Sequence, residues 1–177
     1  MIVDGPYGDI PIRVHTPDRP SGAGLIWAHG GAFFGGDLDM PESDWVARRL
    51  SEHGITVVTV GYRLAPIMDW ATGEQAPHQD GERFHYPVAS EEVGEVFTWA
   101  GRSGINVSGW VVGGASAGGN LAAGATLRLR DTGRALPRGV VLVYPVLHAE
   151  LPPMSTRYGP PASSTAPNSP PPESTPP

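Results

Sequence analysis

The sequence predicts an α/β fold in which helices cover both faces of a mostly parallel sheet, giving a three-layer sandwich. Short apolar or β-branched runs, typical of buried parallel strands, recur along the first 150 residues. Segments with helical spacing of apolar residues lie between these runs. Strands that alternate with helices favour a parallel sheet with right-handed crossovers. The chain of 177 residues is long enough for one domain with a substantial core.

Each element has its own local signal. Residues 10–16 alternate apolar and polar side chains, as half-buried strands do, whereas residues 55–60 are strongly β-branched. Gly54 directly follows the helical pattern of residues 43–53 and signals the end of that helix. Residues 91–99 have one apolar face and one charged face, as an amphipathic helix does. The predicted strands are residues 10–16, 24–28, 55–60, 107–112 and 140–144, and the predicted helices are residues 43–53, 91–99 and 118–130. A long loop is expected over residues 66–86, and Trp27 and Trp110 are expected in the core.

The composition changes sharply near Leu151. Residues 152–177 contain ten of the chain's twenty prolines and almost no large apolar side chain. Such a segment cannot bury enough surface to offset the entropy of ordering it. We therefore expect one domain over residues 1–151 and a disordered Pro/Ser/Thr-rich tail over residues 152–177. The P-x-x-P match at residues 167–170 leaves open an interaction protein that acts through this tail.

Composition also excludes several classes of function. The chain has no cysteine, which rules out disulfides, thiolate metal sites and a thiol nucleophile. Its net charge is −6, lysine is absent and no basic run suggests nucleic-acid binding. There is no signal-peptide pattern at the N-terminus and no apolar run near the ~18 residues of a membrane span. These features predict a soluble, cytoplasmic protein that binds neither nucleic acid nor membrane.

A candidate nucleophile follows the predicted strand 107–112. Residues 114–118 read Gly-Ala-Ser-Ala-Gly and open the next predicted helix, which is the context of a G-x-S-x-G turn that raises a serine above a sheet. Gly114 and Gly118 suit such a turn because it leaves no room for side chains. Ser116 is therefore the candidate nucleophile. The alternative is a serine that simply caps the helix.

A second glycine motif, His29-Gly30-Gly31-Ala32-Phe33-Phe34-Gly35-Gly36, directly follows the predicted strand 24–28. Acyl transfer needs donors that face the oxyanion of the tetrahedral intermediate, and backbone N–H groups in a glycine loop can supply them. The N–H of Ala117, at a helix N-terminus, is a further candidate donor. A generic glycine turn is the alternative. A phosphate loop is disfavoured because no Gly-Lys-Ser/Thr follows.

Together these motifs resemble the hormone-sensitive-lipase-like esterases of the α/β-hydrolase fold (fold-3). The matching segments, in order and spacing over residues 10–147, are 29–32, 62–66, 84–89, 114–120 and 144–145. The resemblance implies the N-terminal portion of that fold and a carboxylesterase that forms an acyl-enzyme on Ser116. A small-molecule ester is the implied substrate, and no cofactor is implied.

The resemblance also implies roles for single residues. His29 would hold the glycine loop without acting as the base, and Gly114 and Gly118 would support the serine turn. Gly30 would shape the glycine loop. The oxyanion hole is assigned to Gly30, Gly31, Ala32 and Ala117.

The sequence departs from the family pattern at several positions. Ala32 replaces a glycine, Ala115 replaces the usual aspartate before the nucleophile, and Ile67 replaces a glutamate. An additional loop follows at about residues 68–83. Its His78, Asp80 and Glu82, with His85, lack the spacing of metal ligands, so no metal is expected.

The catalytic acid and base are not identifiable. In the family both follow the nucleophile, in the order Ser, Asp/Glu, His. The acidic residues after Ser116 are Asp131, Glu150 and Glu173. His148 is the only histidine after Ser116, and it comes earlier in the chain than the base of the family does. We therefore expect a C-terminally truncated esterase that is inactive alone, with an uncovered sheet edge through which it could associate. A non-catalytic remnant that binds ester-like ligands is the alternative.

Overall fold

The computed structural model of the protein describes residues 1–67, 72, 74, 84–105 and 107–148. Contacts divide the chain into two units, Met1–Leu147 and His148–Pro177, and His148 is the one described residue of the second. The tail expected at residues 152–177 and nearly all of the additional loop at 68–83 lie outside the described residues.

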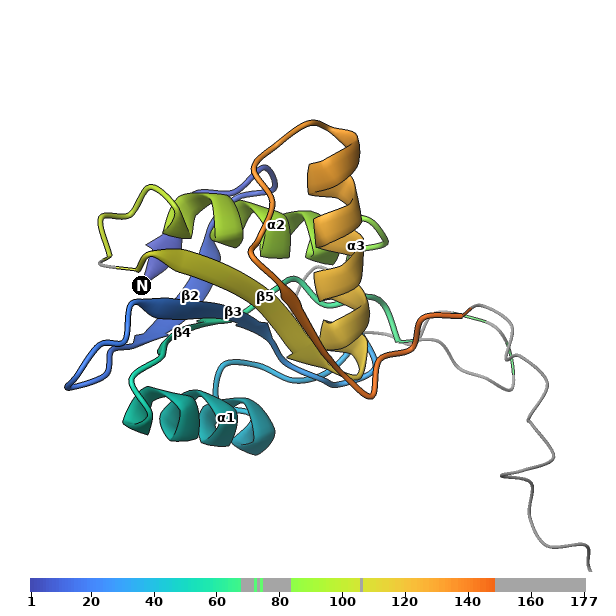
Figure 1. The fold of residues 1–177 in the computed structure, drawn as a ribbon. Coiled ribbons are helices and arrows are strands. Elements are labelled where there is room, and N and C mark those ends of the chain that lie inside the picture. Colours follow the sequence, from blue (N-terminus) through green and yellow to red (C-terminus); the bar gives the residue numbers. More distant parts are fainter. Residues whose placement is uncertain (68–71, 73, 75–83, 106, 149–177) are drawn as a thin grey trace, which may run out of the picture. The chain divides into compact units, whose positions relative to one another are not determined.

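The first unit contains a six-stranded sheet with the order β1-β2-β4-β3-β5-β6 (Figure 1). Its strands are β1 (Ile2–Val3), β2 (Ile10–His15), β3 (Ala23–Ala28), β4 (Thr56–Val60), β5 (Gly109–Ala115) and β6 (Val140–Val143). Strands β4, β3, β5 and β6 are parallel neighbours, whereas β2 is antiparallel to both β1 and β4. The prediction of a mostly parallel sheet is confirmed. The two-residue β1 was not predicted because it is too short to show a pattern.

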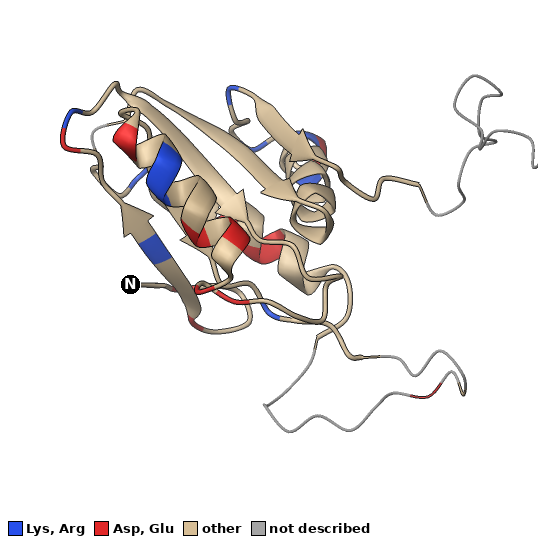
Figure 2. Ribbon diagram, turned by 90° about the horizontal axis from the view of Figure 1, so that it is seen from below, with Lys and Arg blue, Asp and Glu red and all other residues tan. Residues whose placement is uncertain are grey.

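Helices cover both faces of this sheet. Helix α1 (Pro41–Glu52) lies on one face, and α2 (Val88–Ala100) and α3 (Ala117–Asp131) lie on the other (Figure 1). Proline near its start, acidic residues in its first turn and an arginine in its last turn all favour α1. Figure 2 shows acidic residues near the start of α1, basic ones after them, and one more acidic residue at its end, where the helix finishes at Glu52. The three predicted layers are confirmed, with each helix somewhat longer than its sequence pattern.

Side chains along β3 alternate between two hydrophobic clusters. Leu25 and Trp27 pack with Ala47 of α1, whereas Ile26 lies in the larger cluster that includes residues of α2 and α3. Trp110 belongs to that larger cluster, so both tryptophans expected in the core are buried. The sheet is thus covered on both sides, and the carboxyl ends of β3 and β5 lie side by side because these strands pair in parallel.

One prediction about α2 is wrong. Its charged residues were expected on the exposed face, but Glu92 is completely buried. Glu92 accepts a hydrogen bond from the backbone N–H of Arg63 at 2.7 Å and forms an ion pair with the guanidinium of Arg63. Burial raises the pKa of the Glu92 carboxyl, and Arg63 acts in the opposite direction. The pair ties the segment after β4 to α2.

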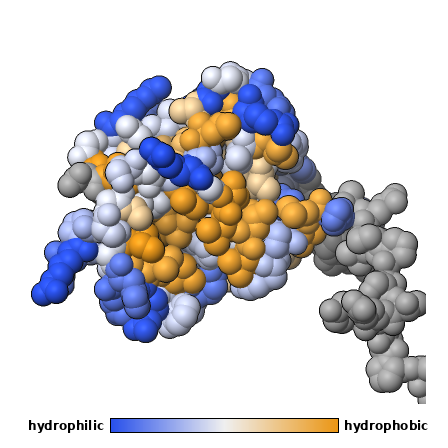
Figure 3. Space-filling model, viewed as in Figure 1, coloured by the Kyte–Doolittle hydropathy of each residue, from blue (hydrophilic) through white to orange (hydrophobic). Residues whose placement is uncertain are grey.

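Strand β6 lies at the end of the strand order and leaves apolar side chains exposed. Val140, Val141 and Leu142 are 39%, 44% and 37% exposed. Beside them is an apolar groove of about 620 Å³, lined by residues of β3, α1, β5 and β6. Figure 3 shows hydrophobic side chains gathered over this part of the surface. The sheet edge expected to be uncovered is therefore uncovered in the described part of the chain.

Candidate active site

Ser116 lies in the turn between β5 and α3. Strand β5 continues to Ala115, three residues beyond its predicted end, so the strand leads directly into the serine. The backbone of Ser116 is left-handed, with φ 51° and ψ −115°, and its N–H donates to the Val143 carbonyl at 2.9 Å. Such a conformation costs about 1–3 kcal/mol and persists only where the surroundings impose it.

The Ser116 side chain makes no hydrogen bond that caps α3. The alternative of a simple capping serine is therefore wrong. The side chain is partly exposed, and within the described residues its hydroxyl has no hydrogen-bond partner. A strained serine whose hydroxyl is not used for structure fits the strand–turn–helix context of a nucleophile.

The flanking glycines are required by close packing. A Cβ at Gly118 would lie 2.1 Å from the Ala28 carbonyl oxygen, and one at Gly114 would lie 2.4 Å from the Gly118 carbonyl carbon. The ends of β3 and β5 and the first turn of α3 therefore meet here. This packing brings the glycine loop to the serine, since a Cβ at Gly30 would lie 3.7 Å from Ser116 Cβ.

The glycine loop has an unusual backbone. Gly31, Ala32 and Phe33 all have positive φ, at 118°, 52° and 71°. The Gly31 carbonyl accepts hydrogen bonds from the N–H groups of Phe34 and Gly35, at 3.2 and 2.9 Å. Ala32 thus holds a left-handed conformation in spite of its side chain, and the loop is a tight turn.

This turn leaves donors unused. In the part of the chain that the structure describes, the N–H groups of Gly31, Ala32 and Ala117 have no hydrogen-bond partner. The N–H of Gly30 instead faces Glu42 Oε2 at 3.5 Å. Three of the four residues assigned to the oxyanion hole therefore have unused amides, and Gly30 places the loop against the serine.

His29 is a buried structural residue. Its ring stacks on Tyr62 with centroids 4.2 Å apart, and its Nδ1 lies 2.6 Å from the Gly30 carbonyl oxygen. Because a carbonyl can only accept, Nδ1 carries the proton. The Tyr62 hydroxyl donates to the His29 carbonyl at 2.9 Å. Burial lowers the pKa of His29 and raises that of Tyr62, so both side chains are neutral near pH 7.

The segment after β4 braces the same loop. The Ala65 N–H donates to the Phe33 carbonyl at 2.8 Å, and the Phe84 N–H donates to the Leu64 carbonyl at 2.9 Å. The sequence does not predict the contact of Tyr62 with His29 or that of Arg63 with Glu92. Their place in the Tyr-Arg-Leu-Ala-Pro motif was the signal that could have pointed to this bracing role.

An apolar cavity of about 250 Å³ lies where this brace meets α3. Phe33 of the glycine loop, Phe84 and Leu121 are among its apolar lining residues, and Asn120 is one of its polar lining residues. Asn120 follows Ser116 by one turn of α3, and its side-chain amide donates to the Val146 carbonyl at 2.6 Å. The cavity offers an apolar space next to the serine turn.

Among the described residues of the first unit, no group makes a hydrogen bond to the Ser116 hydroxyl, so none is in contact to take its proton. Asp131 pairs with Arg130 at 2.8 Å at the far end of α3, and His148 is exposed in the second unit. Glu150 and Glu173 lie outside the described residues. The described part of the first unit therefore brings together the candidate nucleophile and the amide donors, and no acid or base contacts Ser116 there.

The described residues contain neither a metal-binding cluster nor a membrane-spanning helix. There, no cluster of three or more His, Asp or Glu side chains could hold a metal ion. His78, Asp80 and Glu82 lie outside them. No helix in the described part is long and apolar enough to cross a membrane.

Comparisons with known proteins show the family to which this fold belongs. The profile of a family described as alpha/beta hydrolase fold matches residues 25–167. The chain is 32% identical over 161 residues to an ethyl acetate hydrolase of Pseudomonas putida, covering 85% of this chain and 45% of that protein. Among solved structures, an esterase of Pyrobaculum calidifontis superposes with a TM-score of 0.67 at 31% identity, covering 82% of this chain and 44% of the other.

A brefeldin A esterase, described as a bacterial homologue of human hormone sensitive lipase, superposes with a TM-score of 0.68 at 28% identity. The superposition covers 82% of this chain and 38% of the brefeldin A esterase. The chain therefore spans less than half of the length of each of these relatives.

Proposed function

The chain belongs to the α/β-hydrolase fold family, with hormone-sensitive-lipase-like esterases among its relatives, and on that premise we propose that it carries the nucleophile half of a serine carboxylesterase. The observation that carries the proposal is the strained Ser116 turn beside three unused backbone amides. A turn needed only for folding would not require a left-handed serine with an uncommitted hydroxyl.

In the proposed reaction, Ser116 Oγ attacks the ester carbonyl carbon and its proton passes to a base. The oxyanion then accepts hydrogen bonds from the N–H groups of Gly31, Ala32 and Ala117. Loss of one such donor typically raises the barrier by about 2.7–4 kcal/mol. Collapse of the tetrahedral intermediate releases the alcohol and leaves an acyl-enzyme, which water hydrolyses in the same way.

The base and its carboxylate partner are proposed to lie outside the described part of the first unit. We propose that they belong to a segment equivalent to the part of the relatives that this chain does not span. Without an adjacent base a serine hydroxyl is a weak nucleophile, so residues 1–148 alone are inactive. The ester is proposed to be small, since the P. putida relative is named for ethyl acetate and the cavity at Phe33 and Phe84 is only about 250 Å³.

A chimaera tests this function. Residues 1–147 are joined to the part of the P. calidifontis esterase that follows its matched region, and p-nitrophenyl acetate hydrolysis is measured. A folded chimaera is expected to hydrolyse the ester, and its Ser116→Ala variant is expected to lose at least about 1,000-fold in kcat. A cooperatively melting chimaera whose rate is unchanged by Ser116→Ala would contradict the assignment.

The exposed edge leads to a second proposal, that the isolated chain self-associates through β6. An unpaired apolar edge is a template for pairing with another strand, and a lysine on it opposes such pairing. We expect the wild-type mass in light scattering to rise with concentration, and Val141→Lys to reduce that rise. Leu127→Lys, on the exposed side of α3, is the matched control and should behave as wild type. A wild-type chain that stays monomeric at every concentration would contradict the proposal.

A further inference from the structure

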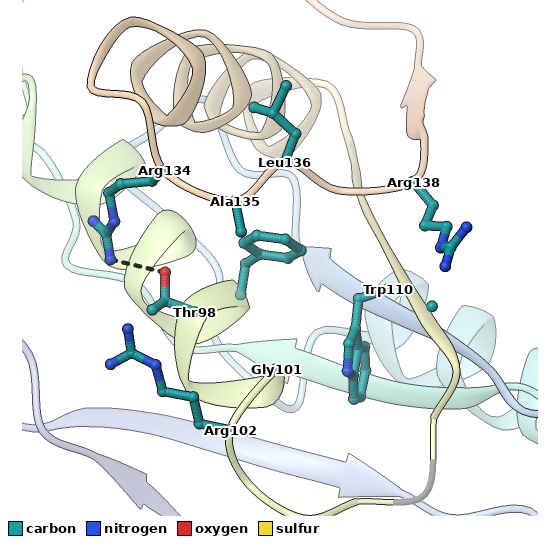
Figure 4. A pocket seen from close by; sticks show the side chains of 10 residues that line it. Thr98, Gly101, Arg102, Trp110, Arg134, Ala135, Leu136 and Arg138 are labelled. Atoms are coloured by element: carbon teal, nitrogen blue, oxygen red, sulfur yellow. Dashed lines mark hydrogen bonds between the residues drawn. The ribbon is translucent and has the colours of Figure 1, made fainter.

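A second cavity, of about 410 Å³, lies at the end of β5 opposite to Ser116. It is bounded by the C-terminal part of α2, the start of β5 and the segment that joins α3 to β6 (Figure 4). Gly109 on its wall precedes Ser116 by seven residues of extended chain, which places the two ends of the strand roughly 20 Å apart. The volume is within the roughly 300–1,000 Å³ of small-molecule sites. Because the cavity and Ser116 lie at opposite ends of β5, this cavity is separate from the candidate active site.

The inner surface of this cavity is apolar. Phe97 of α2 and Trp110 of β5 belong to the hydrophobic core and present their remaining surface here, at 8% and 7% exposure. Leu136 and Ala135 add a wall, and Leu136 is half exposed. The cavity therefore offers flat apolar surface to an aromatic or aliphatic group.

Three arginines stand around this apolar surface. Figure 4 shows Arg102, Arg134 and Arg138 at the cavity. Arg134 is held in place by Glu95, at 2.6 and 3.2 Å, and by the Thr98 hydroxyl at 2.8 Å. The hydrogen bond to Glu95 raises the pKa of Arg134, and the Glu95 carboxylate largely balances the positive charge of Arg134.

The other two guanidinium groups are not balanced. Ten of the twelve arginines are described, and seven of those have a carboxylate oxygen within 4.0 Å. The three without such a partner among the described residues are Arg19, Arg102 and Arg138. Two of the three line this one cavity, in a chain whose net charge is −6. The cavity is thus a local concentration of uncompensated positive charge.

Arg138 is positioned by its surroundings. Its backbone N–H donates to the Trp110 carbonyl at 2.8 Å. A Cβ at Gly109 would lie 3.0 Å from Arg138 Nε and 3.1 Å from its Cδ, so the glycine makes room for the arginine side chain beside the strand. Arg102 follows the end of α2, where a positive charge also favours the helix dipole. That explanation does not cover Arg138, which lies next to the start of β6.

We propose that this cavity binds an organic anion that has a flat apolar body and carboxylate groups. The apolar body would lie against Trp110, Phe97 and Leu136. The carboxylates would pair with Arg102 and Arg138, because the planar guanidinium fork matches carboxylate geometry. A cation would be repelled, and a neutral diamide would offer the guanidinium groups only uncharged carbonyl acceptors, which bind them more weakly than carboxylates do. Binding does not require chemistry at Ser116, so it can be tested separately from the proposed function.

Calorimetric titration of the 177-residue chain with 2,6-naphthalenedicarboxylate tests the proposal, with the corresponding dicarboxamide as the neutral probe. We expect saturable binding of the dianion and much weaker binding of the diamide, which lacks the charge-assisted hydrogen bonds. Arg102→Gln/Arg138→Gln should weaken binding by about tenfold or more, since each change removes a charge-assisted hydrogen bond. Gly109→Ala, which keeps every charge but displaces Arg138, should weaken it severalfold.

Arg19→Gln is the matched control, because Arg19 also lacks a described carboxylate partner but does not line the cavity. This variant and Ser116→Ala should bind as wild type does. Circular dichroism and a thermal melt check that each variant is folded. The proposal is overturned if the dianion does not bind, if the diamide binds equally well, or if the folded double variant keeps wild-type affinity.

Discussion

Replacing Gly118 with alanine is expected to unfold the protein or destabilise it by more than about 4 kcal/mol, among the largest effects of a single substitution. The new Cβ would lie 2.1 Å from the Ala28 carbonyl oxygen and 2.4 Å from the His29 carbonyl oxygen. Both contacts are with backbone, which cannot rotate away, so β3 and α3 must separate. Denaturant unfolding followed by circular dichroism measures the loss.

Gly124→Ala is the matched control in the same helix. A Cβ there would meet nothing nearer than Ser90 Cβ at 3.6 Å. Because alanine is the better helix former, this change should leave stability unchanged or raise it by about 0.5–1 kcal/mol. Equal stabilities of the Gly118→Ala and Gly124→Ala chains would contradict the close approach of β3 to α3.

The second large effect is expected from Glu92→Ala. This change removes the carboxylate that accepts the Arg63 N–H and pairs with the Arg63 guanidinium, and it leaves that partly buried cation unpaired. Breaking one side of a buried pair typically costs about 3–5 kcal/mol. The midpoint of denaturant unfolding should therefore fall sharply.

Glu95→Ala, one turn further along α2, is the comparison. Glu95 pairs with Arg134 at the surface, where such pairs contribute about 0–1 kcal/mol. A Glu92→Ala chain as stable as Glu95→Ala would show that the Arg63–Glu92 pair does not hold the segment after β4 to α2.

The sequence predicted the layers of the fold because the helices have clear periodicity and the buried strands are short apolar or β-branched runs. It placed the end of β5 too early, since Gly113 and Gly114 carry no strand signal. They are strand residues because β3 pairs with them, through Trp27 and Ala28. The burial of Glu92 was missed because its partner, Arg63, is 29 residues away in the sequence and only tertiary packing brings the two together.

The candidate site was predicted in its parts rather than in its geometry. The motifs located Ser116, Gly114 and Gly118 as a turn, and the glycine loop as a source of amides. They could not show that Ala32 takes a left-handed conformation, or that the N–H of Gly30 faces Glu42. The first depends on the hydrogen bonds that close the turn at residues 31–35, and the second on a contact between the loop and α1; the motif letters encode neither.

The central claim is that Ser116 is a nucleophile whose base lies outside the described residues. Its most direct test is the intact mass of the 177-residue chain and of the chimaera after incubation with a fluorophosphonate, with Ser116→Ala forms alongside. We expect one adduct on the chimaera, absent from its Ser116→Ala variant, and none on the folded chain alone. An adduct at Ser116 of the chain alone, or a folded, hydrolytically active chimaera without one, would contradict it.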